Sequence, residues 1–105
     1  MAFNPAPTAV WPGYTSNGTR ITIPLADIDG LTAAQADADT GDWRAIVVAI
    51  CEQLWAYQEA LEEADKPVAT VIAEPLEQTI FNQDRITYEF DFYNVKESPS
   101  LLPGL

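Results

Sequence analysis

The sequence predicts an α+β fold in which one long amphipathic helix packs on a small antiparallel sheet in β-α-β-β order, with extended proline-rich N- and C-terminal arms. Three observations predict it: apolar residues recur at heptad spacing within residues 43–64, the segments on either side alternate apolar and polar residues, and prolines gather near both ends. The 105 residues suffice for one domain. We divide it into an N-terminal arm (1–18), an α+β core (19–97) and a C-terminal tail (98–105).

Both arms combine prolines with large apolar residues. Proline lacks an amide donor and keeps the preceding residue extended, so we expect polyproline-like backbone and turns there. The aromatic anchors of the N-terminal arm are Phe3, Trp11 and Tyr14, and the apolar residues of the tail are Leu101, Leu102 and Leu105. These side chains dock either on the core of their own chain or on a neighbouring subunit, and we favour the neighbour.

The first strand is expected over residues 19–25, where β-branched apolar residues alternate with polar ones. Pro24 places this strand near its end or on a sheet edge, because proline cannot donate to a ladder. Residues 26–42 form a connection that Gly30 interrupts, with a short helical turn over residues 33–36.

The helix is the clearest element of the sequence. Its first apolar stripe follows spacings of four and three residues: Trp43, Val47, Ile50, Leu54, Tyr57, Leu61 and Ala64. Thr40 or Asp42 is the expected N-cap, and Pro67 ends the element. A second stripe, Val48, Cys51 and Trp55, makes the apolar arc too wide for one sheet, so we expect the arms or a second subunit to cover it.

Two further strands follow the helix. Residues 68–81 are rich in β-branched residues, with Pro75 at a bulge or an edge, and residues 82–84 form a hairpin turn. Residues 85–92 alternate, which places Ile86, Tyr88, Phe90 and Phe92 on an inward face. We assign Tyr88, Phe90, Phe92 and Tyr93 to the core; an aromatic platform for a ligand is the alternative.

Charge and missing residue types restrict the possible functions. Sixteen acidic and five basic residues give a net charge of −11, which disfavours binding to nucleic acid and to anionic membranes. There is no histidine, so the commonest general base and zinc ligand are missing. Cys51 is expected to be a small buried hydrophobic residue rather than a nucleophile or redox sensor, in a soluble protein made in a reducing cytoplasm. We predict no enzyme activity and no cofactor.

Five aspartates lie close together before the helix: Asp27, Asp29, Asp37, Asp39 and Asp42. Such oxygen-rich segments suit calcium or magnesium, but Gly41 and Val48 occupy the wrong positions for a calcium-binding EF-hand loop. We expect these aspartates to cap the helix and solvate the loop, and a weak divalent-ion site is the alternative. A pair of catalytic carboxylates would arise by chance among so many acidic residues, so it has no predictive value.

Three segments carry a resemblance to a known class of protein: residues 16–25 (SNGTRITIPL), 31–37 (LTAAQAD) and 40–44 (TGDWR). They are similar to small virion proteins of tailed phages, in particular those that infect cyanobacteria, and the likeness extends over most of residues 16–95. It implies a capsid cement (decoration) protein on the capsid surface that bridges subunits of the major capsid protein. It implies no catalytic residues.

We therefore expect a structural virion protein that forms a homo-oligomer, as a dimer or trimer. The expected interface residues are Phe3, Trp11, Tyr14, Val48, Cys51, Trp55, Leu101, Leu102 and Leu105. A minor tail or neck component is one alternative. An acidic protein that mimics DNA and inhibits a host protein is another, although such a mimic needs acidic residues spaced along one face.

Overall fold

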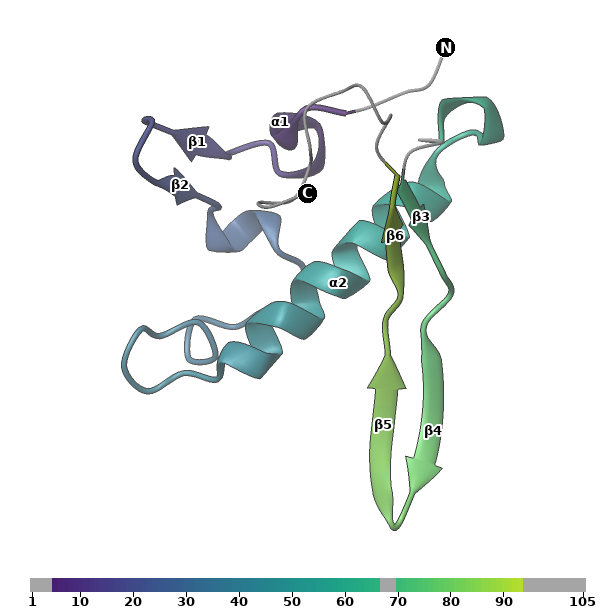
Figure 1. The fold of residues 1–105 in the computed structure, drawn as a ribbon. Coiled ribbons are helices and arrows are strands. Elements are labelled where there is room, and N and C mark those ends of the chain that lie inside the picture. Colours follow the sequence, from purple (N-terminus) through teal and green to yellow (C-terminus); the bar gives the residue numbers. More distant parts are fainter. Residues whose placement is uncertain (1–4, 67–69, 94–105) are drawn as a thin grey trace. The chain divides into compact units, whose positions relative to one another are not determined.

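The computed structural model describes residues 5–66 and 70–93. It confirms an α+β protein with one long helix and small antiparallel sheets (Figure 1). The chain divides into two compact units: a helical unit, Asn4–Ala60, and a hairpin unit, Leu61–Leu105 with Met1–Phe3. The packing of the helix on a sheet and the single domain stay predictions.

The helical unit begins with short elements. They are α1 (Pro7–Val10), β1 (Thr15–Ser16), β2 (Ile21–Thr22) and the 3-10 turn η1 (Leu25–Asp27). β1 pairs antiparallel with β2, with Ser16 opposite Ile21. Of the strand predicted over residues 19–25, only Ile21 and Thr22 are in a strand. The Asn17 side chain accepts hydrogen bonds from the Thr19 and Arg20 amides, and these bonds hold residues 19 and 20 in a turn.

The long helix, α2, spans Trp43–Ala60. Asp42 is its N-cap, since Asp42 Oδ1 accepts a hydrogen bond from the Arg44 amide at 3.0 Å. The helix ends one turn earlier than the apolar spacing predicts, so Leu61 and Ala64 lie outside it. The last turn of α2 holds no basic residue, and its one acidic residue, Glu59, lies unfavourably near the negative end of the helix dipole. A 3-10 turn, η2 (Glu63–Asp65), follows.

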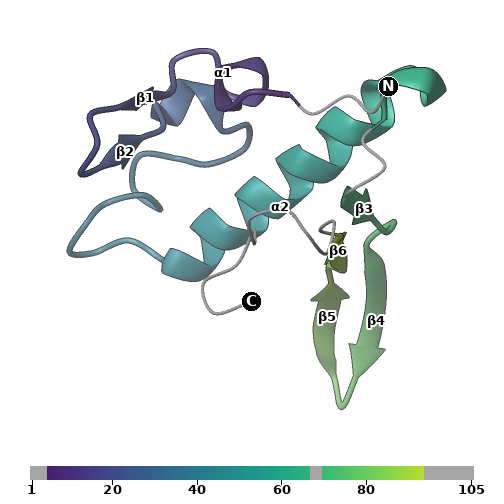
Figure 2. The same ribbon diagram turned by 45° about the horizontal axis from the view of Figure 1, so that its top comes forward.

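The hairpin unit contains β3 (Thr70–Ile72), β4 (Leu76–Ile80), β5 (Gln83–Thr87) and β6 (Phe90–Phe92). β3 pairs with β6 and β4 pairs with β5, both antiparallel (Figures 1 and 2). Between the two ladders, residues 73–75 lie opposite residues 88–89. The first strand therefore has one extra residue between the ladders. Pro75 lies in this interval, in agreement with its predicted position at a bulge or an edge.

The turn of the hairpin lies one residue earlier than predicted. Ile80 pairs with Gln83, so the two central residues are Phe81 and Asn82, with φ angles of 52° and 61°. Two positive φ angles define the turn that matches the twist of a hairpin. The expected turn residues Gln83 and Asp84 belong instead to β5.

Little of the described chain is buried. Ile28, which follows η1, is 7% exposed and is the single buried residue among those described. The inward face predicted for residues 86–92 is only partly covered. Tyr88 and Phe90 are half-buried, whereas Ile86 and Phe92 are exposed. The Phe90 and Phe92 rings stack with centroids 6.2 Å apart, so these two residues share a face as the alternation predicts.

Candidate functional site

The N-terminal segment is fastened to α2 of its own chain. Trp11 Nε1 donates a hydrogen bond to Gln53 Oε1 at 2.9 Å, and Gln53 Nε2 donates to the Asp27 carbonyl oxygen. The Asp27 carboxylate in turn accepts from the Gly13 amide at 2.6 Å. Tyr14 stacks on Trp11 with ring centroids 6.3 Å apart. Trp11 and Tyr14 are thus half-buried on their own chain, and α1 shows that this arm is not extended throughout.

Close approach of the backbone makes this arrangement possible at Gly13. A Cβ atom built there would lie 2.6 Å from Pro24 Cγ and 2.9 Å from Asp27 Oδ2. Only glycine therefore allows the residue-13 amide to reach the Asp27 carboxylate. The hydrogen bonds of Gln53 and Asp27 thus join residues 11–13 and the end of η1 to α2.

An apolar cleft of about 300 Å³ opens beside these contacts. Residues between β2 and position 36, including some that follow η1, supply one wall, and α2 supplies the other. The main lining residues are Ile23, Leu25, Ile28, Leu31, Ile46 and Ile50. Ile21 stands at the rim, where its side chain is 63% exposed. A cleft lined by aliphatic side chains is suited to an apolar group, and these side chains supply no catalytic group.

The first two turns of α2 carry further exposed apolar residues. Trp43 is 73% exposed, and Val47 and Val48 are also exposed. Trp43 and Val47 begin the heptad stripe, so the described chain leaves the start of that stripe open to solvent. Of the interface residues predicted on the second stripe, Val48 is exposed, whereas Cys51 and Trp55 are half-buried.

Among the described residues, the most exposed large apolar side chain is at the tip of the hairpin. Phe81 is 95% exposed. Every residue of β5 is exposed, and so is every residue of β4 except Ile80. Two-stranded hairpins are marginally stable alone in water. Sequence reasoning missed Phe81, Ile21 and the exposure of Trp43. The other predicted interface residues, Phe3, Leu101, Leu102 and Leu105, lie outside the described residues.

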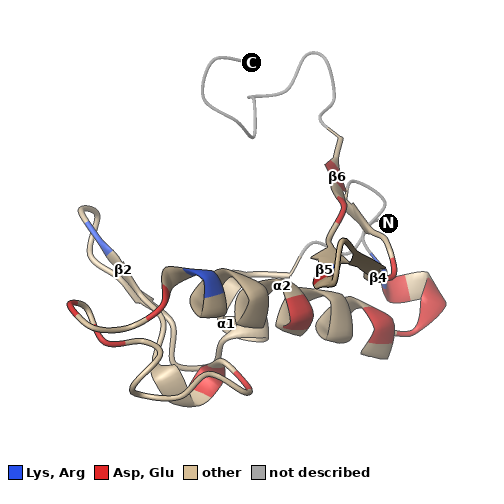
Figure 3. Ribbon diagram, turned by 90° about the horizontal axis from the view of Figure 1, so that it is seen from below, with Lys and Arg blue, Asp and Glu red and all other residues tan. Residues whose placement is uncertain are grey.

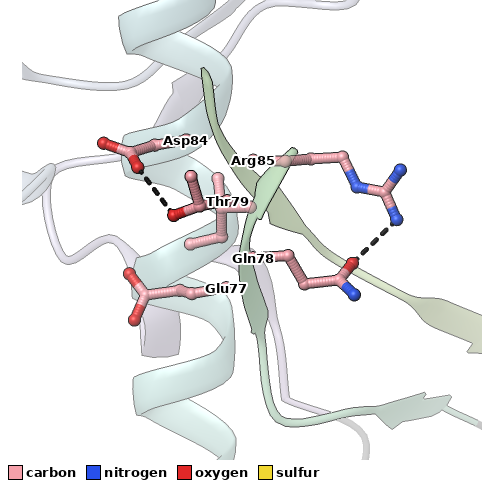
Figure 4. Close-up of a pocket in the computed structure, with 6 residues that line it drawn as sticks. Glu77, Gln78, Thr79, Asp84 and Arg85 are labelled. Carbon is pink, nitrogen blue, oxygen red and sulfur yellow. Dashed lines mark hydrogen bonds between the residues drawn. The ribbon is translucent and has the colours of Figure 1, made fainter. Parts of the chain in front are cut away.

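The polar side chains of the hairpin do not form one site. Arg85 donates to Gln78 at 2.8 Å, and Thr79 donates to Asp84 at 3.3 Å. Figure 4 shows that the Gln78–Arg85 pair projects on one side of the hairpin, and Thr79, Asp84 and Glu77 on the other. Because these side chains point away from one another, they do not converge on a ligand.

Two aspartates before α2, Asp37 and Asp42, accept hydrogen bonds from nearby backbone amides. Asp37 Oδ1 accepts hydrogen bonds from the Asp39 and Thr40 amides, each at 2.9 Å. These bonds favour the carboxylate and lower the pKa of Asp37 below its ordinary value of 3.8. Asp42 caps α2. In the described part of the chain, no three acidic or cysteine side chains are grouped so that they could hold a metal ion.

Cys51 lies on α2 and is half-buried rather than buried. Burial raises the pKa of its thiol, and the charge of Glu52 raises it further. The neutral thiol therefore predominates at neutral pH, and it is a weak nucleophile.

Acidic residues are spread over loops, helix α2 and the strands (Figure 3). No helix within residues 5–66 and 70–93 combines the length and apolar character needed to cross a membrane. Comparison of the chain with protein-family models, with curated proteins and with solved structures found no match.

Proposed function

We propose that this chain is a non-enzymatic structural protein of a tailed-phage virion, of the capsid cement type. In this proposal it lies on the capsid surface, bridges subunits of the major capsid protein and forms a dimer or trimer. It is made in the host cytoplasm, needs no cofactor and contacts neither nucleic acid nor membrane.

The single observation that supports this proposal best is the exposure of large apolar side chains in both units. Trp43 is 73% and Phe81 95% exposed, while Ile28 alone among the described residues is buried. Covering one such side chain is worth about 1.5–3 kcal/mol. Monomeric proteins rarely leave large apolar patches in water, and such patches mark surfaces that bind other proteins. A subunit of a shell would cover them with its neighbours.

The proposal includes finer features of the fold. They are the predicted β-α-β-β order and the predicted role of the tail residues Leu101, Leu102 and Leu105 in contacts with neighbouring subunits. Because Trp11 already donates its indole N–H to Gln53, the N-terminal arm contributes mainly by shaping the helical unit. Exposed residues on α2, such as Val48 and Trp43, make the stronger contacts with neighbours.

Quantitative mass spectrometry of purified phage particles tests the proposal. A cement protein is present in many copies per particle, in fixed ratio to the major capsid protein. A few copies per particle would instead indicate a tail or neck component. Absence from particles would contradict a virion role and favour the acidic inhibitor, whose binding to a basic host protein weakens with salt.

Binding to empty capsids provides a second test that needs only the purified proteins. We expect the wild-type chain to cosediment with capsids, and a Trp43→Ser variant to cosediment less. Glu59→Gln, a change at an exposed position of the same helix, serves as the matched control. Failure of the wild-type chain to bind capsids would count against the bridging role.

A further inference from the structure

We propose that the Asn17–Gly18 pair is a site of spontaneous deamidation, and that the folded turn between β1 and β2 holds the pair back from reacting. The inference goes beyond the proposed function and does not depend on it, because the reaction takes place within one chain and needs only water. It rests on three features of the turn: the Asn–Gly pair itself, the hydrogen bonds of the Asn17 side chain and the shortness of the two strands.

Deamidation joins the side chain of an asparagine to the main chain. The backbone nitrogen of the next residue loses its proton and attacks the side-chain carbonyl carbon, Cγ. A new C–N bond closes a five-membered succinimide ring, and the side-chain nitrogen leaves as ammonia. Water then opens the ring at either carbonyl and yields aspartate or isoaspartate. The reaction thus consumes one water and releases one ammonia, which is why asparagine is a labile residue.

Gly18 offers an unhindered backbone nitrogen for this attack, because it carries no side chain. Its φ angle is 89°, and a Cβ atom built there would meet nothing within 4 Å. Among the described residues, the Gly18 amide donates none of the hydrogen bonds that hold the turn. The orientation of the Asn17 side chain therefore controls whether the ring can close.

Three hydrogen bonds fix the side chain of Asn17. Its Oδ1 accepts from the Arg20 amide at 2.9 Å, and from the amide and the hydroxyl of Thr19 at 3.0 Å each. The Asn17 amide also donates to the Arg20 carbonyl oxygen at 3.2 Å, so Asn17 extends the pairing of the two strands. Ring closure requires a rotation that brings Cγ against the Gly18 nitrogen. Because this rotation takes Oδ1 away from its donors, the turn must open first.

The turn can open without unfolding the rest of the helical unit. β1 and β2 are two residues long each, and they pair only as Thr15↔Thr22 and Ser16↔Ile21. All residues from 15 to 22 are exposed. Short, exposed elements open locally at a low cost in free energy. The native chain therefore deamidates slowly, at a rate set by the fraction of molecules whose turn is open.

The two products differ in their effect on the turn. Aspartate at position 17 keeps the same main chain, and its carboxylate accepts the same hydrogen bonds more strongly than the amide does. Isoaspartate adds a methylene group to the main chain, so Ser16 can no longer stay opposite Ile21 with the turn unchanged. Because Ile21 lines the apolar cleft, isoaspartate alters one wall of that cleft.

Peptide mapping by mass spectrometry measures the rate at which Asn17 is lost. The wild-type chain is incubated at mildly alkaline pH, both native and in guanidinium chloride. Because three hydrogen bonds must break, we expect Asn17 to react at least about ten-fold more slowly in the native chain. Equal rates in the two states overturn the protective role of the turn. Asn82, which precedes Gln83, is the internal reference. An unfolded chain in which Asn17 reacts no faster than Asn82 overturns the site itself.

A matched pair of variants tests the hydrogen bonds of the turn. Thr19→Val removes the hydroxyl donor but keeps the amide donor and the branched shape. We expect it to accelerate the loss of Asn17 about five-fold in the native chain, with no change in guanidinium chloride. Thr22→Val, in β2, is the control and should react as the wild type does. Equal native rates in the two variants, whether raised or unchanged, contradict control by the Asn17 hydrogen bonds.

Hydrogen exchange of the Thr19 and Arg20 amides, followed by NMR, tests the difference between the products. The Asn17→Asp variant should protect both amides at least as well as the wild type. Chain enriched in isoaspartate at position 17 by chromatography should lose this protection. Protection in both proteins, or in neither, overturns the effects assigned to the two products.

Discussion

Trp11 Nε1 and Gln53 Oε1 lie 2.9 Å apart and form a hydrogen bond that joins the N-terminal segment to the middle of α2. The same Gln53 amide donates to the Asp27 carbonyl oxygen. One side chain therefore fixes two segments that are far apart in the sequence. Because the Asp27 segment forms part of the cleft wall, the shape of the apolar cleft depends on this residue.

Replacing Gln53 should loosen the helical unit. Gln53→Leu keeps a similar volume but removes both hydrogen bonds, and it leaves the Trp11 N–H and the Asp27 carbonyl without this partner. We expect a loss of about 1–3 kcal/mol in the free energy of unfolding. Urea unfolding followed by tryptophan fluorescence measures the change. Gln58→Leu on the same helix is the control, and an equal loss in both variants would contradict the role given to Gln53.

The loop before α2 should not tolerate a side chain at residue 41. A Cβ atom at Gly41 would collide with the Gln35 carbonyl oxygen and lie 2.6 Å from the Asp37 carbonyl oxygen. Both oxygens accept hydrogen bonds that close this loop, from the Asp42 and Gly41 amides. We expect Gly41→Ala to destabilise the protein by roughly 1–3 kcal/mol, and Ala38→Ser in the same loop to have little effect. Thermal unfolding of the two variants provides the comparison.

The same loop should respond to acid through Asp37. Its pKa is lowered from 3.8 by hydrogen bonds from the Asp39 and Thr40 amides. The carboxylate is thus favoured in the folded chain, and its contribution to stability is fully present above pH 3.8. That contribution is lost as the pH falls through the folded pKa. Carboxyl NMR titration should place the pKa of Asp37 below 3.8, and a value at or above 3.8 would show that these bonds do not form in solution.

The hairpin turn should become more stable when Phe81 is removed. The double change Phe81→Asn/Asn82→Gly introduces the pair favoured at two positive φ angles. Relief of the left-handed cost of phenylalanine should favour the closed hairpin by about 1 kcal/mol. Amide hydrogen exchange in β4 and β5 should then slow by about five-fold. Unchanged or faster exchange would mean that the turn carries no strain.

Several elements of the fold could be predicted from the sequence because local patterns determine them. The apolar spacing from Trp43 onward indicated α2, and the short polar side chain of Asp42 indicated its start. Pro75 indicated the bulge, because proline cannot continue a ladder. The alternation of residues 85–92 correctly placed Phe90 and Phe92 on one face.

Other features depend on contacts that a local pattern does not contain. Alternation groups Ile86 and Phe92 on a face but does not say whether anything covers that face. The turn was expected at Asn82–Asp84 because those residues favour turns, whereas Phe81 disfavours the positive φ that it adopts. Gln53 is one polar residue on a largely apolar helix, and nothing in the sequence identifies Trp11 as its partner.

Hydroxyl-radical footprinting of the chain, free and within purified phage particles, tests most directly whether other subunits cover its exposed apolar residues. Oxidation is read by mass spectrometry at Trp43 and Phe81, with Trp11 as the internal reference because its own chain half-buries it. We predict strong protection of Trp43 and Phe81 in particles and little change at Trp11. Equal oxidation of Trp43 and Phe81 in the free and particle-bound chain would contradict the account.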